Sequence, residues 1–155
     1  MEAVKRYKTF TYHTSLEWTQ NRQGTLSSDS KPSLDISGPP EFKGIPGVWT
    51  PEDFYVASAE MCAMTTFLSF GERKNIPLVS YRSSAEGVLE FVEGKYRFTK
   101  IFVKPHIVVG KSSPRDGAGW TEEQVKEVVH QAHDNCLIAN SMATEVEILP
   151  TIELV

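Results

Sequence analysis

The stretch at residues 49–77 constrains the fold of this chain most, because it is the longest segment with a helical pattern and carries a cysteine in its interior. Thr50 is a suitable N-cap, and Pro51 stands at the first helical position, where its missing N–H costs nothing. At the other end, Asn75 lies two positions before Pro77, and a residue that directly precedes a proline is disfavoured in the helical region. The pattern therefore predicts one long helix between Thr50 and Asn75.

The apolar residues of this predicted helix, between positions 54 and 70, are not confined to one narrow stripe. Small side chains, among them Ala57, Ala59 and Ala63, permit close approach of a neighbouring backbone. Such a helix is expected to lie inside a wrapping of sheet.

Composition narrows the possible classes of protein. The 155-residue chain suits a single domain, residues 1–155, that needs no disulfide or metal to complete its core. The net charge of -4 comes without a stripe of Lys or Arg, which argues against a nucleic-acid partner. The polar N-terminus does not resemble a signal peptide, and no stretch approaches the roughly 20 apolar residues of a membrane span. We therefore expect a cytoplasmic protein that binds neither nucleic acid nor membrane.

Strand patterns flank the long helix and indicate an α+β fold. They occur at residues 4–18, 25–28 and 34–37, which predict an antiparallel meander, and at 78–91, 96–109 and 145–154. The segments at 78–91 and 96–109 form a predicted hairpin, and the shift of apolar parity between Phe98 and Ile101 predicts a bulge or a small irregularity.

A second helix is predicted after the loop at residues 110–120. Thr121 and Gln124 make a capping box at its start, and Asn135 marks its end. Its inner face is expected to carry four apolar residues, Val125, Val128, Val129 and Ala132. Residues 137–142 are expected to add a further helical turn.

The two cysteines, Cys62 and Cys136, are the candidate reactive groups. In a reducing compartment, a disulfide between two cysteines is more often transient and catalytic than permanent and structural. The number of cysteines alone nevertheless favours two buried, unreactive thiols. Only the thiolate is a nucleophile, and Cys62 lies about three turns from the start of its helix, beyond the reach of the helix dipole. A cation from another segment, such as the turn that contains Arg22, is then needed to lower the pKa of Cys62. The spacing of residues in the sequence does not identify which cation this is.

Several short motifs together resemble one known family, the OsmC/Ohr family of osmotically inducible and organic hydroperoxide resistance proteins. The motifs are Arg22-Gln23-Gly24 in the meander, Pro51-Glu52 at the start of the long helix, Cys62 ten residues after that glutamate, Thr99-Lys100-Ile101, and Ala132-His133-Asp134-Asn135-Cys136. The resemblance extends over essentially the whole chain.

The resemblance implies both a fold and an activity. The fold is an intertwined homodimer in which antiparallel sheets wrap two long central helices. The activity is that of a thiol-dependent peroxidase in oxidative stress defence, with Cys62 as the peroxidatic residue and Cys136 as the resolving one. Arg22 and Glu52 would hold the thiolate and position the peroxide.

The implied reaction requires no metal and no organic cofactor. The Cys62 thiolate attacks an organic hydroperoxide, or hydrogen peroxide, and the resulting sulfenic acid condenses with Cys136 to a disulfide. An external dithiol, often a lipoyl group in this family, then reduces the disulfide. Among the residues around Cys62, namely Phe54, Tyr55, Met61, Met64 and Phe67, most are expected in the core and some in an apolar substrate pocket.

The chain departs from the family pattern at two positions. Leu137 follows the second cysteine, where the family's peroxidases commonly have proline, and Met61 precedes Cys62, where a small residue is usual. These departures bear on substrate preference and efficiency more than on the thiol chemistry.

Helix geometry adds an expectation about Glu52. On one unbroken helix, ten residues separate Glu52 and Cys62 by about 15 Å along the axis and turn their side chains about 80° apart. One arginine does not bridge such a gap easily. Either a second subunit supplies Glu52 to each site, or the helix begins later than Pro51.

Two other functions remain open from the sequence. His130, His133 and Cys136 recur every three residues, so that with Cys62 they make a candidate zinc site. A non-catalytic binder of small molecules on the same fold is the other alternative, and it predicts thiols of ordinary reactivity.

Overall fold

The computed structural model describes residues 7–112 and 118–155 of the chain. These form two compact units, Met1–Asp53 and Phe54–Val155, which are described separately below. The start of the predicted strand at residues 4–18 and the middle of the predicted loop at 110–120 lie outside the described residues. The expectation of one domain over residues 1–155 stays a prediction.

The first unit contains the predicted antiparallel meander, with strands β1 (Ser15–Gln20), β2 (Gln23–Ser27) and β3 (Leu34–Ser37) in that order. A short 3-10 helix, η1 (Pro40–Phe42), lies in the loop that follows. The prediction of strand as early as residue 4 is wrong for residues 7–14, which form no strand although they are rich in aromatic residues and threonine. The pairing of β1 with β2 stops at Ser15 and Ser27, and strand propensity alone does not form a strand without a neighbour.

The predicted long helix is α1 (Pro51–Lys74). Thr50 and Asp53 cap it reciprocally, since the Asp53 N–H donates to Thr50 Oγ1 over 3.1 Å and the Thr50 N–H donates to the Asp53 carboxylate over 3.0 Å. At its C-terminus Asn75 takes a positive φ of 55°, and the Ile76 N–H reaches back to the Gly71 carbonyl over 2.9 Å. This is the Schellman arrangement that ends a helix, so the predicted boundaries are confirmed.

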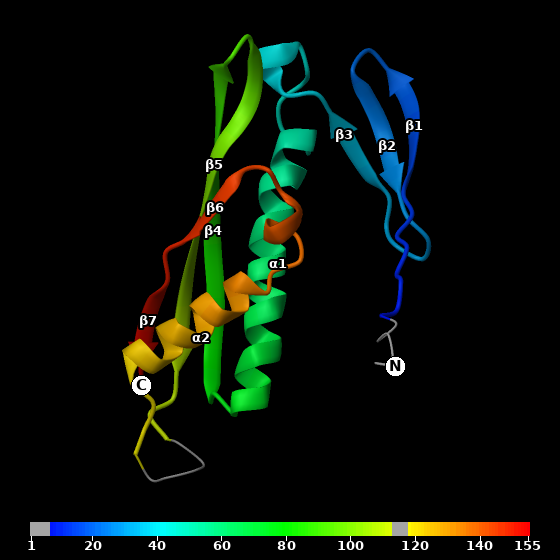
Figure 1. Ribbon diagram of the computed structural model, residues 1–155. Helices are drawn as coiled ribbons and strands as arrows, with labels where there is room; N and C mark the ends of the chain where they lie inside the picture. The colour runs from blue at the N-terminus through cyan, green and yellow to red at the C-terminus, as the bar shows by residue number, and fades with distance from the viewer. Residues whose placement is uncertain (1–6, 113–117) are drawn as a thin grey trace, which may run out of the picture. The chain divides into compact units, whose positions relative to one another are not determined.

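Strands β4 (Leu78–Val92) and β5 (Lys95–Val109) form the predicted long hairpin, which runs alongside α1 in Figure 1. Val88 pairs with Lys100 whereas Leu89 pairs with Phe98, so that Thr99 is the extra residue of a bulge. The parity shift in the sequence is thereby explained.

The second helix is α2 (Glu122–Asp134), with the predicted capping box and with Asn135 as its C-cap. A 3-10 helix, η2 (Ala139–Ser141), supplies part of the helical turn expected at residues 137–142. All four residues predicted for the inner face of α2 are buried.

The final strand pattern at residues 145–154 forms two strands rather than one, β6 (Glu145–Ile148) and β7 (Thr151–Leu154). Pro150 lies at the break, and it faces the part of β5 that contains Pro105. Neither proline has an N–H to donate, so the ladder is interrupted there. Both strands pair parallel to β5, because α2 carries the chain back along the sheet. The expectation of antiparallel sheets therefore holds for the meander and the hairpin but not for these strands.

The core of the second unit lies between the helices and β5. Ala59, Ala63, Phe67 and Gly71 recur every four residues on α1 and are all buried. The first three share one cluster with residues of β5 and α2, and its completely buried members are Ile101, Val103, Ile107, Val109 and Val125. A Cβ at Gly87 of β4 would meet the side chains of Val56 and Phe98, so this glycine lets α1 approach the hairpin closely.

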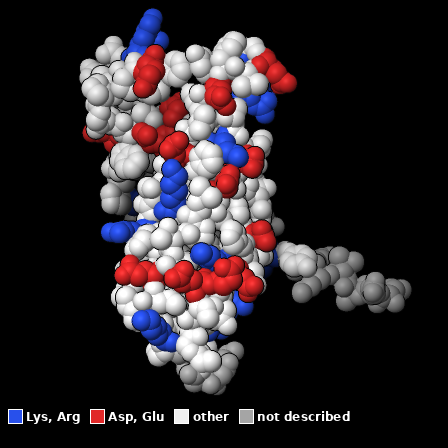
Figure 2. All heavy atoms as spheres, turned by 90° about the vertical axis from the view of Figure 1, so that its left-hand side faces the viewer, with Lys and Arg blue, Asp and Glu red and all other residues white. Residues whose placement is uncertain are grey.

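On the face drawn in Figure 2, lysine and arginine side chains are scattered among aspartate and glutamate rather than gathered into a stripe. Among the residues that the structure describes, no helix is both long and apolar enough to cross a membrane.

Candidate active site

Cys62 lies in the middle of α1, one position before the buried Ala63. This places its side chain at the edge of the buried stripe rather than inside it, and the residue is accordingly half-buried. A thiol at such an edge is held by packing and remains open to a small reactant.

Cys136 lies in the turn between α2 and η2 and is completely buried. Its N–H donates to the His133 carbonyl over 3.0 Å, and its own carbonyl accepts from the Asn140 N–H over 3.0 Å. The Asn140 side chain also donates to the Asp134 carbonyl over 3.0 Å. These bonds fix the turn that presents Cys136 to α1.

The side chains of the two cysteines lie close enough together for each thiol to shift the pKa of the other. The assignment of Cys62 and Cys136 as a catalytic pair stays a prediction. Burial raises the pKa of Cys62, but donors outweigh it: the Cys136 thiol, the Ile138 N–H, the Thr66 hydroxyl and the Leu137 N–H. The pKa of Cys62 therefore lies below its ordinary value.

The pKa of Cys136 moves the other way. Burial raises it, and the hydrogen bond that its proton makes to Cys62 raises it further, to about 11. Of the two thiols, Cys62 is therefore the one that ionises first, and Cys136 stays protonated beside it.

The donors around Cys62 were not predicted from the sequence, where we expected a cation to be necessary. In the described part of the chain, the groups that lower the pKa of Cys62 are neutral donors. The contact with Thr66 could have been predicted from the sequence, because a residue four positions after Cys62 lies on the same face of the helix. The contacts of the Leu137 and Ile138 N–H groups could not have been predicted, because the direction of these groups depends on how the turn folds.

Arg22 lies at the tight turn between β1 and β2, in the first unit, and is exposed. Its carbonyl accepts the Gly38 N–H over 3.1 Å. Among the described residues of this unit, no ion pair joins Arg22 to Glu52. The assignment of Arg22 to the site stays a prediction.

Glu52 is the second residue of α1, so it shares one uninterrupted helix with Cys62. The alternative of a later helix start is therefore wrong, and the separation of about 15 Å along the axis applies. Glu52 Oε2 is buried and has no hydrogen-bond partner in the described part of the chain. A buried carboxylate oxygen of this kind is costly unless a cation or donor reaches it.

The candidate zinc ligands are not brought together in the described part of the chain. His130 is exposed, and the His133 Nε2 lies 3.0 Å from the Val146 carbonyl. Within residues 7–112 and 118–155, no group of three or more His, Cys, Asp or Glu side chains is arranged to hold a metal ion.

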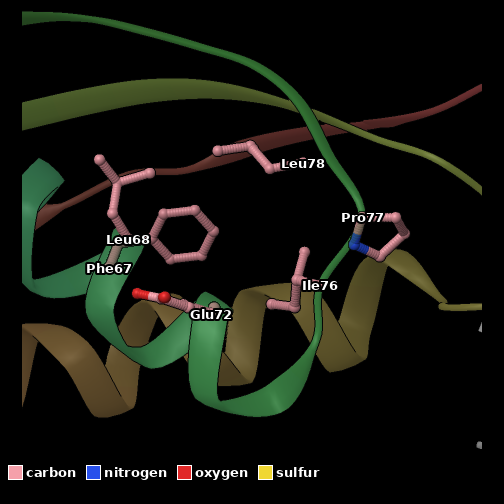
Figure 3. A pocket seen from close by; sticks show the side chains of 7 residues that line it. Phe67, Leu68, Glu72, Ile76, Pro77 and Leu78 are labelled. Carbon is pink, nitrogen blue, oxygen red and sulfur yellow. The ribbon is translucent and has the colours of Figure 1, made fainter. Parts of the chain in front are cut away.

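A hollow of about 500 Å³ lies at the far end of α1, away from the cysteines. Figure 3 shows Phe67, Leu68, Ile76 and Leu78 lining it, with the Glu72 carboxylate at one side. Of the aromatic and methionine residues proposed for a substrate pocket, only Phe67 lines this hollow. Tyr55 instead stacks on Phe98 and hydrogen-bonds the Thr144 hydroxyl over 2.8 Å.

The two pKa shifts predict different alkylation profiles for the cysteines. A thiolate reacts and a thiol does not, so the iodoacetamide reaction of Cys62 should reach half its maximal rate at a lower pH than that of an ordinary cysteine. The corresponding point for Cys136 should lie near pH 11. Initial rates measured by mass spectrometry of the two peptides give both profiles, with the urea-unfolded chain as reference. Faster alkylation of Cys136 than of Cys62 at neutral pH would contradict the expectation.

Comparison with known proteins identifies relatives of this chain by sequence and by structure. Residues 44–149, more than half of the chain, match the sequence model of a family described as OsmC-like protein. An uncharacterised Bacillus subtilis protein, YmaD, is 24% identical over 88% of this chain and 89% of its own length. The structure of an OsmC-like protein of unknown function from Vibrio cholerae is 26% identical, with a TM-score of 0.83 over 92% of this chain and 100% of that chain. A Legionella pneumophila structure described as an organic hydroperoxide resistance protein OsmC is 19% identical, with a TM-score of 0.70 over 95% and 99% of the two chains.

Proposed function

Because the chain belongs to the OsmC-like protein family, we propose that it is a thiol-dependent peroxidase that reduces organic hydroperoxides through Cys62 and Cys136. The observation that carries this proposal is the proximity of two free thiols, the half-buried Cys62 of α1 and the completely buried Cys136. The pKa of Cys62 lies below its ordinary value, whereas the pKa of Cys136 is raised, so that Cys136 remains a thiol beside the Cys62 thiolate. This division suits one nucleophilic and one resolving cysteine.

The reaction begins when the Cys62 thiolate attacks the terminal oxygen of the hydroperoxide. The O–O bond breaks, an S–O bond forms, and the alkoxide leaves and takes up a proton as the alcohol. Cys62 is then a sulfenic acid. The Cys136 sulfur attacks the Cys62 sulfur and expels the hydroxyl as water, which gives a disulfide. An external dithiol reduces this disulfide and becomes a disulfide itself.

The surroundings of the thiols favour apolar substrates. Met61, Leu137 and Ile138 are sequence neighbours of the two cysteines, and 56%, 76% and 37% of their surfaces are exposed. An alkyl or aryl hydroperoxide buries part of this apolar surface when it approaches Cys62, whereas hydrogen peroxide does not. The same surface suits a reductant whose dithiol is carried on an apolar chain, such as a lipoyl group.

The proposed active form is a homodimer in which each site draws residues from both chains. The Oε2 of Glu52 is buried without a partner, and Glu52 is too far along α1 to reach Cys62 of its own helix. A second subunit that supplies Glu52, together with an Arg22 guanidinium, resolves both difficulties. Arg22 then pairs with the Glu52 carboxylate and adds a positive charge to the neutral donors around the thiolate.

Other features of the chain support association with a second copy. Strand β4 is an edge of its sheet and, among the described strands, pairs with β5 alone. All six residues of β1 are exposed, including Leu16 and Trp18. Long open edges and exposed apolar residues are typical of surfaces that another chain covers.

A prediction for Arg22 follows. The Arg22→Ala variant should raise the pKa of Cys62, because a cation favours the thiolate over the thiol. The shift should be about one pH unit, since the neutral donors of the same chain remain. The pH dependence of Cys62 alkylation measures it, with Arg22→Lys as the variant that keeps the charge. An unchanged profile in Arg22→Ala would remove Arg22 from the site.

The direct test of the proposed function is a peroxide consumption assay. Purified protein is supplied with a dithiol, either dihydrolipoamide or dithiothreitol, and with cumene hydroperoxide or hydrogen peroxide. We expect many turnovers per chain and faster consumption of cumene hydroperoxide. Failure to consume either peroxide beyond the rate of the dithiol alone would refute the proposal.

A further inference from the structure

Thr66 lies one helical turn after Cys62 and on the same face of α1. Its Oγ1 is 3.8 Å from the Cys62 Sγ, within the longer reach of hydrogen bonds to sulfur. Thr66 is half-buried, as Cys62 is, so this contact is partly shielded from water.

The neighbouring Thr65 shows what a helical threonine ordinarily does. Its hydroxyl donates back to the carbonyls of Met61 and Cys62 over 3.1 and 3.2 Å. This back-bonding is the usual way in which a helix satisfies a threonine hydroxyl. In the described part of the chain, the side-chain partner of the Thr66 hydroxyl is instead the Cys62 sulfur. Two adjacent threonines thus have different partners, and only one of them contacts the reactive group.

We propose that Thr66 is a positioning residue for Cys62, whose hydroxyl donates to the sulfur, stabilises the thiolate and holds it toward Cys136. The catalytic consequence rests on the proposed peroxidase function, whereas the effect on the thiol does not. A thiolate accepts a hydrogen bond more strongly than a thiol does, so the contact strengthens when Cys62 loses its proton. The direction of the Cys62 pKa agrees: burial raises it, and the Thr66 hydroxyl is among the donors that lower it.

The consequence for the reaction is a shift of the pH profile rather than a uniform loss. Without the hydroxyl, less of Cys62 is thiolate at neutral pH, and the reaction with hydroperoxide slows in proportion. At a pH above the pKa of both forms, the thiolate is complete in each. The variant should then react as fast as the wild type or slightly faster, since nucleophilicity rises with thiol pKa.

Three variants test the proposal. Thr66→Val replaces the hydroxyl with a methyl group of similar size, Thr66→Ser keeps the hydroxyl, and Thr65→Val removes the neighbouring hydroxyl that bonds only to carbonyls. The alkylation rate of Cys62 is measured against pH for each folded protein, and Tm is recorded beside it. Thr66→Val should raise the apparent pKa of Cys62 by about one pH unit, which is about a tenfold loss of thiolate at low pH. Thr66→Ser and Thr65→Val should keep the wild-type profile.

Two results would overturn the proposal: a wild-type profile in Thr66→Val, or an equal shift in Thr65→Val. A shift in Thr66→Val that Thr66→Ser does not share supports it, whatever the Tm. The alkylation assay uses no peroxide, so its result is independent of the test of the proposed function. If the wild-type protein has no peroxidase activity, a measured shift of the Cys62 pKa in Thr66→Val still supports this inference. If the protein is an active peroxidase and Thr66→Val does not shift the Cys62 pKa, this inference alone is refuted.

Discussion

The Cys62→Ser variant should abolish hydroperoxide reduction, whereas Cys136→Ser should consume about one equivalent and then stall. Formation of the sulfenic acid requires only the first thiol, and its condensation to a disulfide requires the second. Serine preserves the size of each side chain and, at position 136, an O–H donor toward Cys62. The difference between the two variants therefore reports on the role of each sulfur rather than on folding.

The measurement is a single-turnover assay with a few equivalents of cumene hydroperoxide, followed by mass spectrometry of the intact chain. In Cys136→Ser we expect the addition of one oxygen atom at Cys62 and then, with excess peroxide, the addition of a second. Thr65→Val serves as a variant on the same helix that should behave as wild type. Complete loss of the first turnover in both cysteine variants would contradict the assignment.

The second large effect expected is recovery of activity when two inactive chains are combined. Cys62→Ser and Glu52→Ala should each be inactive, and co-refolding of the two should restore about a quarter of wild-type activity. Half of the dimers in a random mixture are heterodimers, and one of their two sites then has Cys62 from one chain and Glu52 from the other. The measurement is peroxide consumption per chain after size-exclusion chromatography.

The matched control places both substitutions on one chain, which is co-refolded with the wild type. If Glu52 acts across the interface, heterodimers of this pair have no complete site, and only the wild-type homodimers contribute, again about a quarter of full activity. If Glu52 acts within its own chain, the same mixture should retain about half, and the first mixture should show none. A fully active monomer would also rule out the shared site.

The sequence predicted the elements whose signals are local. The limits of α1 follow from Thr50 and Pro51 at one end and Asn75 at the other, and the structure contains the corresponding caps. The Thr121 capping box and the bulge at Thr99 are equally local and were equally predictable. The family resemblance and the α+β fold are likewise confirmed.

What the sequence did not predict depends on partners distant in the chain. Residues 7–14 have the composition of a strand but pair with no strand in the described part of the chain. Residues 145–154 have one alternating pattern but divide at Pro150. The direction of β6 and β7 relative to β5 is set by the return path through α2, which alternation alone does not encode.

The candidate site was only partly predictable for the same reason. Cys62 and Cys136 were identified through family motifs, and their assignment as a catalytic pair stays a prediction. The need for a cation was inferred because a buried thiol has a raised pKa. The backbone N–H groups of Leu137 and Ile138 alter that conclusion, and no residue type signals a backbone donor in advance. A proline at position 137 would remove one of these donors, because proline has no backbone N–H.

The central claim is that one hydroperoxide molecule converts the Cys62 thiolate and the Cys136 thiol into a disulfide within one chain. Fully reduced protein is treated with one equivalent of cumene hydroperoxide, quenched with an alkylating agent and digested without reductant for mass spectrometry. We predict loss of both free thiols, a peptide pair linked through Cys62 and Cys136, and a chain that still runs as a monomer under denaturing, non-reducing conditions. Recovery of both cysteines as alkylated thiols, with the hydroperoxide unconsumed, would contradict the claim.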